Sequence, residues 1–204
     1  MKNFLYKMII NSATDYGYQN CLKYVCDKAS ILDVGIGNGV MMDHFHRLIK
    51  DKGLHITGID INKNYLQHCA GNIRQFNLEN HVTIHCQPVE TFDPPQEARF
   101  DYIFFTMSFM LFKNQSLVLD RVHEWLKPNG EILFFQTVFT EKAPLIEFIK
   151  PKLKFVTTID FGKVTYEDQF LGLLQSKNLS VTENRLIKRE WFKGEYRMTV
   201  ASFS

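Results

Sequence analysis

The chain has 204 residues, a formal net charge of +2 and an isoelectric point near 8.3. This length suits one α/β domain and leaves little room for a second, and so mild a charge does not indicate a nucleic-acid-binding face. No stretch has the order of a signal peptide or the roughly 18 apolar residues of a membrane span, so a cytoplasmic protein is expected. The four cysteines form no Cys-x-x-Cys pair and are expected to be reduced. His44 and His46 are two apart on a predicted helix and cannot share a face, so no metal site is expected.

The N-terminal 28 residues precede the first predicted strand. Their first part predicts a short amphipathic helix, and Ser12 or Asp15 is placed to cap a second helix. This second helix is expected over Gln19 to Asp27, leading into the strand. The tyrosines of this segment have two open interpretations: they line a ligand pocket, or they pack against the sheet with their hydroxyls at the surface.

The stretch from Ile31 to Gly39 organises the predicted fold. Ile31 to Val34 is a short run with β-branched residues, interrupted by Asp33, and three glycines follow at alternate positions. Apolar residues at helical spacing from Val40 onward place this loop between a strand and a helix N-terminus. Glycine there lets the backbone approach a ligand closely or take positive φ, and the first N–H groups of the helix are free nearby. The loop is therefore predicted to hold a ligand.

The spacing of the glycines distinguishes two kinds of ligand. A dinucleotide site has Gly-x-Gly-x-x-Gly, whereas this chain has Gly35-x-Gly37-x-Gly39 with Asp33 on the strand before it. This spacing disfavours a nicotinamide-dependent oxidoreductase. Asp33 to Gly39 instead resembles the first motif of the class I S-adenosylmethionine-dependent methyltransferases, in which the loop lies against the methionine and ribose parts of the cofactor. The resemblance implies that S-adenosylmethionine binds to Asp33, Gly35, Gly37, Asn38 and Gly39.

Asp60 ends a second apolar run, His55 to Ile61, about 20 residues after Gly39. An acid at the tip of the second strand of a βαβ unit is placed to accept hydrogen bonds from both ribose hydroxyls. We therefore expect Asp60, with Ile61 beside it, to bind the cofactor. The alternative is that Asp60 is only a turn former or helix N-cap, because Asn62 and a polar stretch follow.

A helix over about 62–76 and a third strand, Val82 to Cys86, come next. In the family that the chain resembles, the residues after this strand hold adenine through a backbone N–H and an acid, and they frequently are Gly-Asp-Ala-Glu. Here they are Gln87-Pro88-Val89-Glu90, so Pro88 stands at the acid position. We expect Val89 to offer its N–H, and Glu90 or Gln87 to receive the exocyclic amine.

The fourth predicted strand, Phe100 to Phe105, leads to Thr106 and Ser108. A transferred methyl group would meet its acceptor there, because ligands of open parallel sheets lie beyond the carboxyl ends of the strands. Asp93 to Gln96 precedes this strand and lacks a stacking aromatic. It therefore predicts a turn, and not the Asp-Pro-Pro-aromatic box of methyltransferases that act on nucleic acid bases.

The remaining pattern predicts three helices and three strands. The helices are expected over about 114–126, 143–149 and 166–176; the strands are expected over Ile132 to Gln136, after a turn at Lys127 to Glu131, and over Leu179 to Trp191 and Glu195 to Phe203 as a hairpin. The predicted fold class is α/β: a seven-stranded, mostly parallel, Rossmann-like methyltransferase sheet with helices on both faces and a C-terminal antiparallel hairpin. Residues 1–204 are expected to form a single domain, in which residues 1–28 cap the cofactor and substrate site.

The resemblance implies an enzyme that transfers the methyl group of S-adenosylmethionine to a small polar molecule, without a covalent nucleophile or a metal. Ser12 to Gly17 and Thr157 to Gly162 resemble segments of the methyltransferase unit of ovothiol biosynthesis, which N-methylates a thiolated histidine. Another small-molecule acceptor and a non-catalytic cofactor-binding subunit remain alternatives. Nucleic acid and membrane partners are not expected, and the oligomeric state is open. The catalytic candidates are Asp15, Tyr16, Thr106 and Asp160, and Thr106 is also expected to bind the cofactor. The substrate-binding candidates are Tyr6, Tyr16, Tyr18, Ser108 and Thr140.

Overall fold

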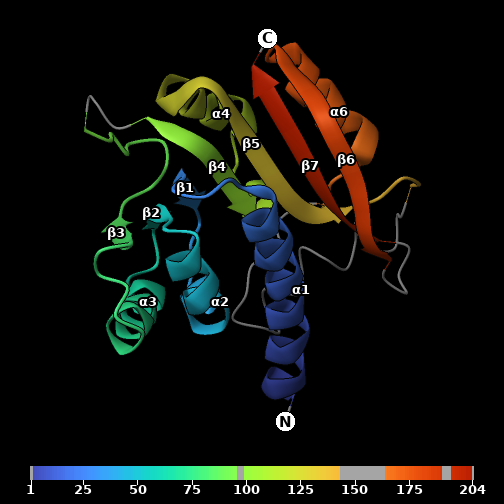
Figure 1. Cartoon of the computed structure of the whole chain (residues 1–204). Coiled ribbons are helices and arrows are strands. Elements are labelled where there is room, and N and C mark those ends of the chain that lie inside the picture. The colour runs from blue at the N-terminus through green and yellow to red at the C-terminus, as the bar shows by residue number, and fades with distance from the viewer. Residues whose placement is uncertain (1, 96–98, 143–163, 190–193, 204) are drawn as a thin grey trace.

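The computed structural model describes the chain except for residues 1, 96–98, 143–163, 190–193 and 204, and except for the side chains of residues 1–12. Its elements in chain order are α1 (Lys2–Tyr24), β1 (Ser30–Val34), α2 (Val40–Asp51), β2 (His55–Asp60), α3 (Lys63–Gln75), β3 (Val82–Cys86), β4 (Phe100–Thr106), the 3₁₀ turn η1 (Phe109–Leu111), α4 (Gln115–Trp125), β5 (Leu126–Val138), α6 (Glu167–Ser176), β6 (Leu179–Arg189) and β7 (Glu195–Phe203). Figure 1 shows their arrangement.

The strands form one seven-stranded sheet in the order β3-β2-β1-β4-β5-β7-β6. The strands β1 to β5 are parallel to one another, whereas β7 is antiparallel to both β5 and β6. The predicted fold class is thereby confirmed, including the C-terminal antiparallel hairpin. The strand order reverses between β1 and β4, so the sheet has its switch point at the carboxyl ends of these two strands, which is where ligands of such sheets bind.

Helices cover both faces of the sheet (Figure 1). The helices α1, α2 and α3 pack on one face, where they bury Leu22, Met41 and Leu66 against Ile31 and Phe104. The helices α4 and α6, together with η1, pack on the other face. There they contact the strand residues whose side chains point to that face, such as Leu32 and Phe105. Neighbouring residues of β1 and β4 thus enter different cores, as the alternation of side chains along a strand requires.

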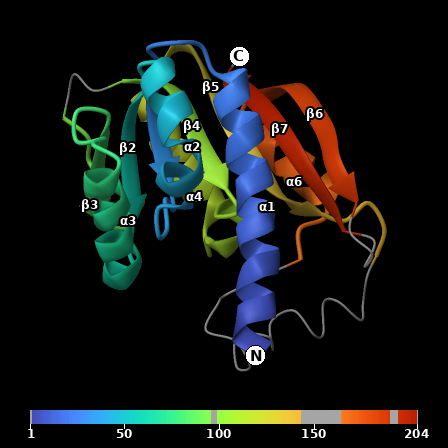
Figure 2. The ribbon, with the colours of Figure 1, turned by 60° about the horizontal axis from the view of Figure 1, so that its bottom comes forward.

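The helix α1 differs from the prediction, which divided residues 1–28 into two helices around Ser12 and Asp15. One continuous helix runs from Lys2 to Tyr24 and packs beside β4, β5 and β7 (Figure 2). Gly17 lies inside this helix against the sheet. A Cβ atom at Gly17 would lie 2.6 Å from Thr106 Cγ2 and 2.7 Å from Phe135 Cδ1. The glycine therefore allows close packing of helix on sheet and does not end the helix.

Two further boundaries differ from the prediction. The expected turn at Lys127 to Glu131 is part of β5, which begins at Leu126 beside Phe100 and contains an irregularity in register and a positive φ of 65° at Asn129. The helix expected after Asp60 begins at Lys63, because Asn62 is its N-cap and accepts from the backbone N–H groups of Asn64 and Tyr65. The predicted helix 143–149 lies outside the described residues.

Candidate active site

The three loop glycines all have positive φ, 87° at Gly35, 64° at Gly37 and 85° at Gly39, but they differ in what surrounds them. A Cβ atom at Gly35 would lie 2.6 Å from Ser108 Cβ, and one at Gly39 would lie 2.8 Å from Cys69 Cα. At Gly37 the nearest atom would be the carbonyl oxygen of Gly35, 3.9 Å away. Gly35 and Gly39 are thus required by packing, whereas Gly37 lines an open space. This open space beside Gly37, called the cradle below, leaves room for a ligand close to the backbone.

Asp60 holds this loop in place from the tip of β2. Its Oδ2 accepts the backbone N–H of Gly37 at 2.9 Å, and its Oδ1 accepts that of Asn62 at 2.8 Å. The loop is also fixed by the N–H groups of Gly35 and Ile36, which both donate to the carbonyl oxygen of Ile59. Asp60 therefore forms the turn, as one of its two interpretations expected, and this role does not exclude ligand binding. Each carboxylate oxygen retains a second lone pair for a ligand.

Asp33, on β1 directly before the loop, is fully buried. Its Oδ2 accepts the hydroxyl proton of Tyr18 at 2.8 Å, while its Oδ1 has no hydrogen-bond partner. Burial raises the pKa of Asp33 to about 7, the Tyr18 hydrogen bond acts in the opposite direction, and the charge of Asp60 adds to the increase. A carboxyl group in this state titrates near neutral pH.

Two residues expected to bind substrate are instead structural in this fold. Tyr18 is 1% exposed and anchors α1 to β1 through Asp33, so it lies in the core and not on a pocket wall. Ser108 is 4% exposed; it packs under Gly35 and donates its hydroxyl proton to the carbonyl oxygen of Val34. Tyr18 was expected at the site because it lies in the N-terminal segment, and Ser108 because it follows the fourth strand. The tertiary hydrogen-bond partners of both hydroxyls place them in structural roles instead.

The expected catalytic pair Asp15 and Tyr16 does not converge on one point. Asp15 Oδ1 lies 2.6 Å from His44 Nδ1 on α2, whereas the ring of Tyr16 lies 5.0 Å from Lys188 Nζ on β6. Thr106 is buried at the end of β4 and faces α1. Thr140 is exposed just beyond β5. Asp160 and the side chain of Tyr6 lie outside the described residues.

The residues expected at the cofactor lie together at the carboxyl ends of β1, β2 and β3. Asn38 and Glu90 are exposed, Val89 is buried, and Ile61 is 72% exposed next to Asp60. The carbonyl oxygen of Pro88 accepts the N–H groups of Thr91 and Phe92, which turns the chain just after β3. Their placement agrees with the expected layout, and their contacts with the cofactor remain predictions.

Gln136 is a polar residue of this region that the sequence reasoning missed. It is 1% exposed, and neither its amide nitrogen nor its amide oxygen has a hydrogen-bond partner. In the part of the chain that the structure describes, four side chains contain such buried, unpartnered polar atoms. Three of these side chains lie at the carboxyl ends of the adjacent strands β1, β4 and β5: Asp33, Thr106 and Gln136. Polar groups of this kind are rare in native proteins. Asp33 and Thr106 point to the face of the sheet that α1 covers, and Gln136 points to the face that α4 and α6 cover. All three lie at the edge of the sheet where ligands of such folds bind.

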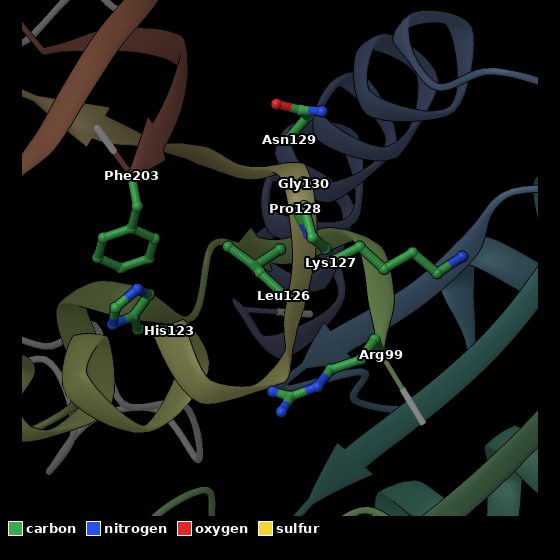
Figure 3. A pocket seen from close by; sticks show the side chains of 8 residues that line it. All are labelled: Arg99, His123, Leu126, Lys127, Pro128, Asn129, Gly130 and Phe203. Atoms are coloured by element: carbon green, nitrogen blue, oxygen red, sulfur yellow. The ribbon is translucent and has the colours of Figure 1, made fainter. Parts of the chain in front are cut away.

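A cavity of about 420 Å³ lies elsewhere, where Arg99, His123, Lys127 and Phe203 surround the start of β5 (Figure 3). The ring of His123 is 3.9 Å from that of Phe203, and Lys127 is paired with Asp101 at 2.9 Å. Because the start of a parallel strand is the end opposite its carboxyl terminus, this cavity is remote from the glycine loop.

Among the described residues, no group of three or more His, Cys, Asp or Glu is placed to hold a metal ion. No helix in the described part is long and apolar enough to span a membrane.

A doubly wound sheet with an antiparallel seventh strand, a glycine loop at the end of β1 and an acid at the tip of β2 defines a class I S-adenosylmethionine-dependent methyltransferase. Residues 26–180 match a family model described as a methyltransferase domain, and the chain belongs to this family. It is an enzyme fold whose cofactor is S-adenosylmethionine.

The curated relatives include carboxy-S-adenosyl-L-methionine synthases. The protein of that name from Shewanella loihica is 24% identical over 140 residues, which cover 69% of this chain and 56% of the relative. The protein from Shewanella baltica is 21% identical over 199 residues, covering 98% of this chain and 76% of the relative. The chain thus matches about half the length of the first relative.

Solved structures with the same fold differ in what they do. The [4+2]-cyclase SpnF superposes with a TM-score of 0.72 at 14% identity, covering 95% of this chain and 80% of its own. Geranyl diphosphate C-methyltransferase from Streptomyces coelicolor gives 0.73 at 11% identity, with 95% and 79% covered. The 1,6-didemethyltoxoflavin-N1-methyltransferase of Burkholderia thailandensis gives 0.64 at 18% identity, with 93% and 76% covered. These likenesses establish the fold.

Proposed function

We propose that this chain transfers the methyl group of S-adenosylmethionine to a small polar molecule bound at the carboxyl ends of β4 and β5. The observation that carries the proposal is the presence of buried polar atoms without partners at the carboxyl ends of β1, β4 and β5, the edge of the sheet that also carries the open cradle at Gly37. Asp33 and Thr106 lie on one face of the sheet there, and Gln136 lies on the other. A ligand that completes these hydrogen bonds would remove their desolvation cost.

The residues at the cradle fit the cofactor. Gly37 leaves room for it, Asp33 offers an unpartnered carboxylate oxygen to a cationic molecule, and Asp60 has lone pairs for ribose hydroxyls. When bound, S-adenosylmethionine supplies a methyl group already activated by a sulfonium. The work left to the protein is to align the acceptor with the methyl–sulfur axis and to exclude water.

Gln136 is the residue we assign to orienting the acceptor. Its amide presents one acceptor atom and one donor group side by side, and it stands at the end of β5, two residues beyond Phe134 on the same side of the strand. Below it, Phe105, Phe109 and Phe134 form an apolar ring cluster with centroids 4.9–5.3 Å apart. An amide above aromatic rings suits a polar heterocycle or an amino acid derivative.

A small acceptor is favoured over a polymer by the net charge of +2, which provides little attraction for nucleic acid. The narrower proposal, N-methylation of a thiolated histidine, rests on the sequence resemblance of two segments. Ser12 to Gly17 is part of α1, and Thr157 to Gly162 lies outside the described residues.

Formation of carboxy-S-adenosylmethionine is the second candidate function, because relatives named carboxy-S-adenosyl-L-methionine synthase match up to 98% of this chain. The two candidates differ in what happens to the cofactor. Mass spectrometry of the cofactor that remains bound through purification distinguishes them: a carboxylated cofactor supports the second candidate, and an unmodified or demethylated one supports methyl transfer.

The test of the main proposal uses isotopically labelled S-adenosylmethionine and a panel of polar small molecules that includes histidine and thiolated histidine. We expect label to pass to one class of acceptor. We expect Gln136→Leu to lower this transfer at least tenfold while the Kd for S-adenosylhomocysteine changes less than twofold. Tight cofactor binding without transfer to any acceptor would instead support a non-catalytic subunit, and equal transfer by Gln136→Leu would remove Gln136 from the acceptor site.

A further inference from the structure

A tyrosine of the N-terminal helix makes a buried hydrogen bond to the acid of the cofactor loop. Tyr18 Oη donates to Asp33 Oδ2 at 2.8 Å, and both side chains are at most 1% exposed. The other carboxylate oxygen of Asp33 has no partner. Asp33, two residues before Gly35, thus has one carboxylate oxygen bound by α1 and the other without a partner.

Among the described residues, none of the groups that affect the pKa of Asp33 carries a positive charge. Tyr18 and Cys21 face it from α1, Cys69 from α3, and Asp60 from the tip of β2. Asp60 opposes ionisation of Asp33, as burial does, whereas the Tyr18 hydroxyl favours the ionised form. The charge state of this buried carboxyl group therefore depends on a single donor in a helix that precedes the glycine loop in sequence.

We propose that Tyr18 is a positioning residue that keeps Asp33 ionised and oriented as the counter-charge for the cationic cofactor, so that the docking of α1 and cofactor affinity are coupled. The inference rests on the cofactor part of the proposed function and is independent of the acceptor. S-adenosylmethionine carries positive sulfonium and ammonium groups, and a buried carboxylate without a cation partner is complementary to such a ligand. Binding then releases a proton whenever Asp33 is protonated in the free protein.

The coupling predicts that removing the Tyr18 hydroxyl changes the pH dependence of cofactor affinity. If Tyr18 had only a structural role, its removal would leave that pH dependence unchanged. Calorimetric titration with S-adenosylmethionine and with S-adenosylhomocysteine between pH 6 and pH 8.5 should give a Kd that rises as the pH falls below about 7, toward tenfold per pH unit. In Tyr18→Phe the loss of the donor raises the pKa of Asp33, so this rise should begin at higher pH. Affinity should be about fivefold to tenfold lower than that of the wild type at pH 7, and within threefold of it at pH 8.5.

The matched control is Tyr24→Phe in the same helix. The hydroxyl of Tyr24 donates to the carboxylate of Glu131 at 3.0–3.1 Å, at the other end of the sheet from the glycine loop. Its removal costs a comparable hydrogen bond and leaves Asp33 untouched. The pH profile of Tyr24→Phe should therefore superimpose on that of the wild type.

Three results would overturn the inference. The first is a wild-type Kd that does not vary over this pH range. The others are a Tyr18→Phe Kd that begins to rise at the same pH as in the wild type, or a Tyr18→Phe loss of affinity that is the same at every pH. If Tyr18→Phe does not fold, the wild type still decides the question. Titration at pH 6.5 in two buffers of different ionisation enthalpy should reveal a proton released on binding, and absence of that proton rejects the role of Asp33. Because every readout is cofactor binding, failure to find a methyl acceptor leaves the result intact, whereas no cofactor binding at all would reject both proposals.

Discussion

The charge of Asp33 is the residue-scale feature with the clearest effect on stability. Its pKa in the fold, about 7, lies above the ordinary value of 3.8, so the folded state binds more protons than the unfolded state between these two values. The stability that Asp33 contributes is therefore complete below about pH 4 and is lost as the pH rises through 7.

We expect Asp33→Asn to raise the free energy of unfolding of the cofactor-free protein at pH 8 by roughly 2–4 kcal/mol, at about 1.4 kcal/mol per pKa unit. The amide retains an acceptor for the Tyr18 hydroxyl and removes the buried charge. Urea unfolding at several pH values measures the effect. The gain should shrink toward pH 5, and a gain that stays constant with pH would show that ionisation of Asp33 is not its source.

Gly37 provides a test that separates ligand contact from backbone strain. Valine at Gly37 would strain a φ of 64° and occupy the open space of the cradle, so we expect at least a hundredfold weaker binding of S-adenosylhomocysteine with a stability loss of about 1–3 kcal/mol. Gly53→Val is the matched control. Gly53 has a φ of 61° and its Cβ would meet only Lys28 Cγ at 3.6 Å, so the strain is similar and the cofactor site is remote. Equal affinities in the two variants would mean that the loop is only a turn.

At the scale of elements, the position of α1 depends on the absence of a side chain at Gly17. Gly17→Val would place atoms within 2.6–2.7 Å of Thr106 and Phe135, so α1 must move away from the sheet. We expect a loss of about 2–3 kcal/mol in the free energy of unfolding, measured by chemical denaturation. Gly172→Val in α6, whose Cβ would meet nothing within 4 Å, should cause no loss of stability, because valine has a higher helix propensity than glycine. Similar losses in both variants would contradict close packing at Gly17.

The sequence was sufficient to predict the strands, the glycine loop and the acid of β2, because local patterns fix them. The glycine spacing and the apolar runs do not depend on distant residues. The course of α1 was not predictable in this way: Ser12, Asp15 and Gly17 are typical of caps and turns, and packing against β4 and β5 overrides that tendency. The same holds for Tyr18 and Ser108, whose hydroxyl partners, Asp33 and Val34, come from other elements. The sequence shows Gln136 as a polar residue inside an apolar run. It does not show that the side-chain amide lacks hydrogen-bond partners, which is the observation that makes Gln136 a candidate site residue.

For the whole molecule, the modest positive charge predicts how it behaves toward polyanions. We expect no retention of the purified protein by single-stranded RNA or duplex DNA at 150 mM salt. A protein with a net charge of +2 is expected to neutralise few phosphates and therefore to release few counterions from the nucleic acid. Fluorescence anisotropy with labelled oligonucleotides measures this, with S-adenosylhomocysteine present to fill the cofactor site. Binding that weakens steeply between 50 and 200 mM salt would contradict a small-molecule acceptor.

The packing of α1 beside β7 brings the first and last elements of the chain together (Figures 1 and 2). The hydroxyl of Tyr24 and the carboxylate of Glu131 are separated by 107 residues, and β7 ends at Phe203. During synthesis α1 leaves the ribosome before β4, β5 and β7, the strands on which it packs. It can dock fully only after β7 has been made, so its contacts with the sheet, which join residues far apart in sequence, form late in folding.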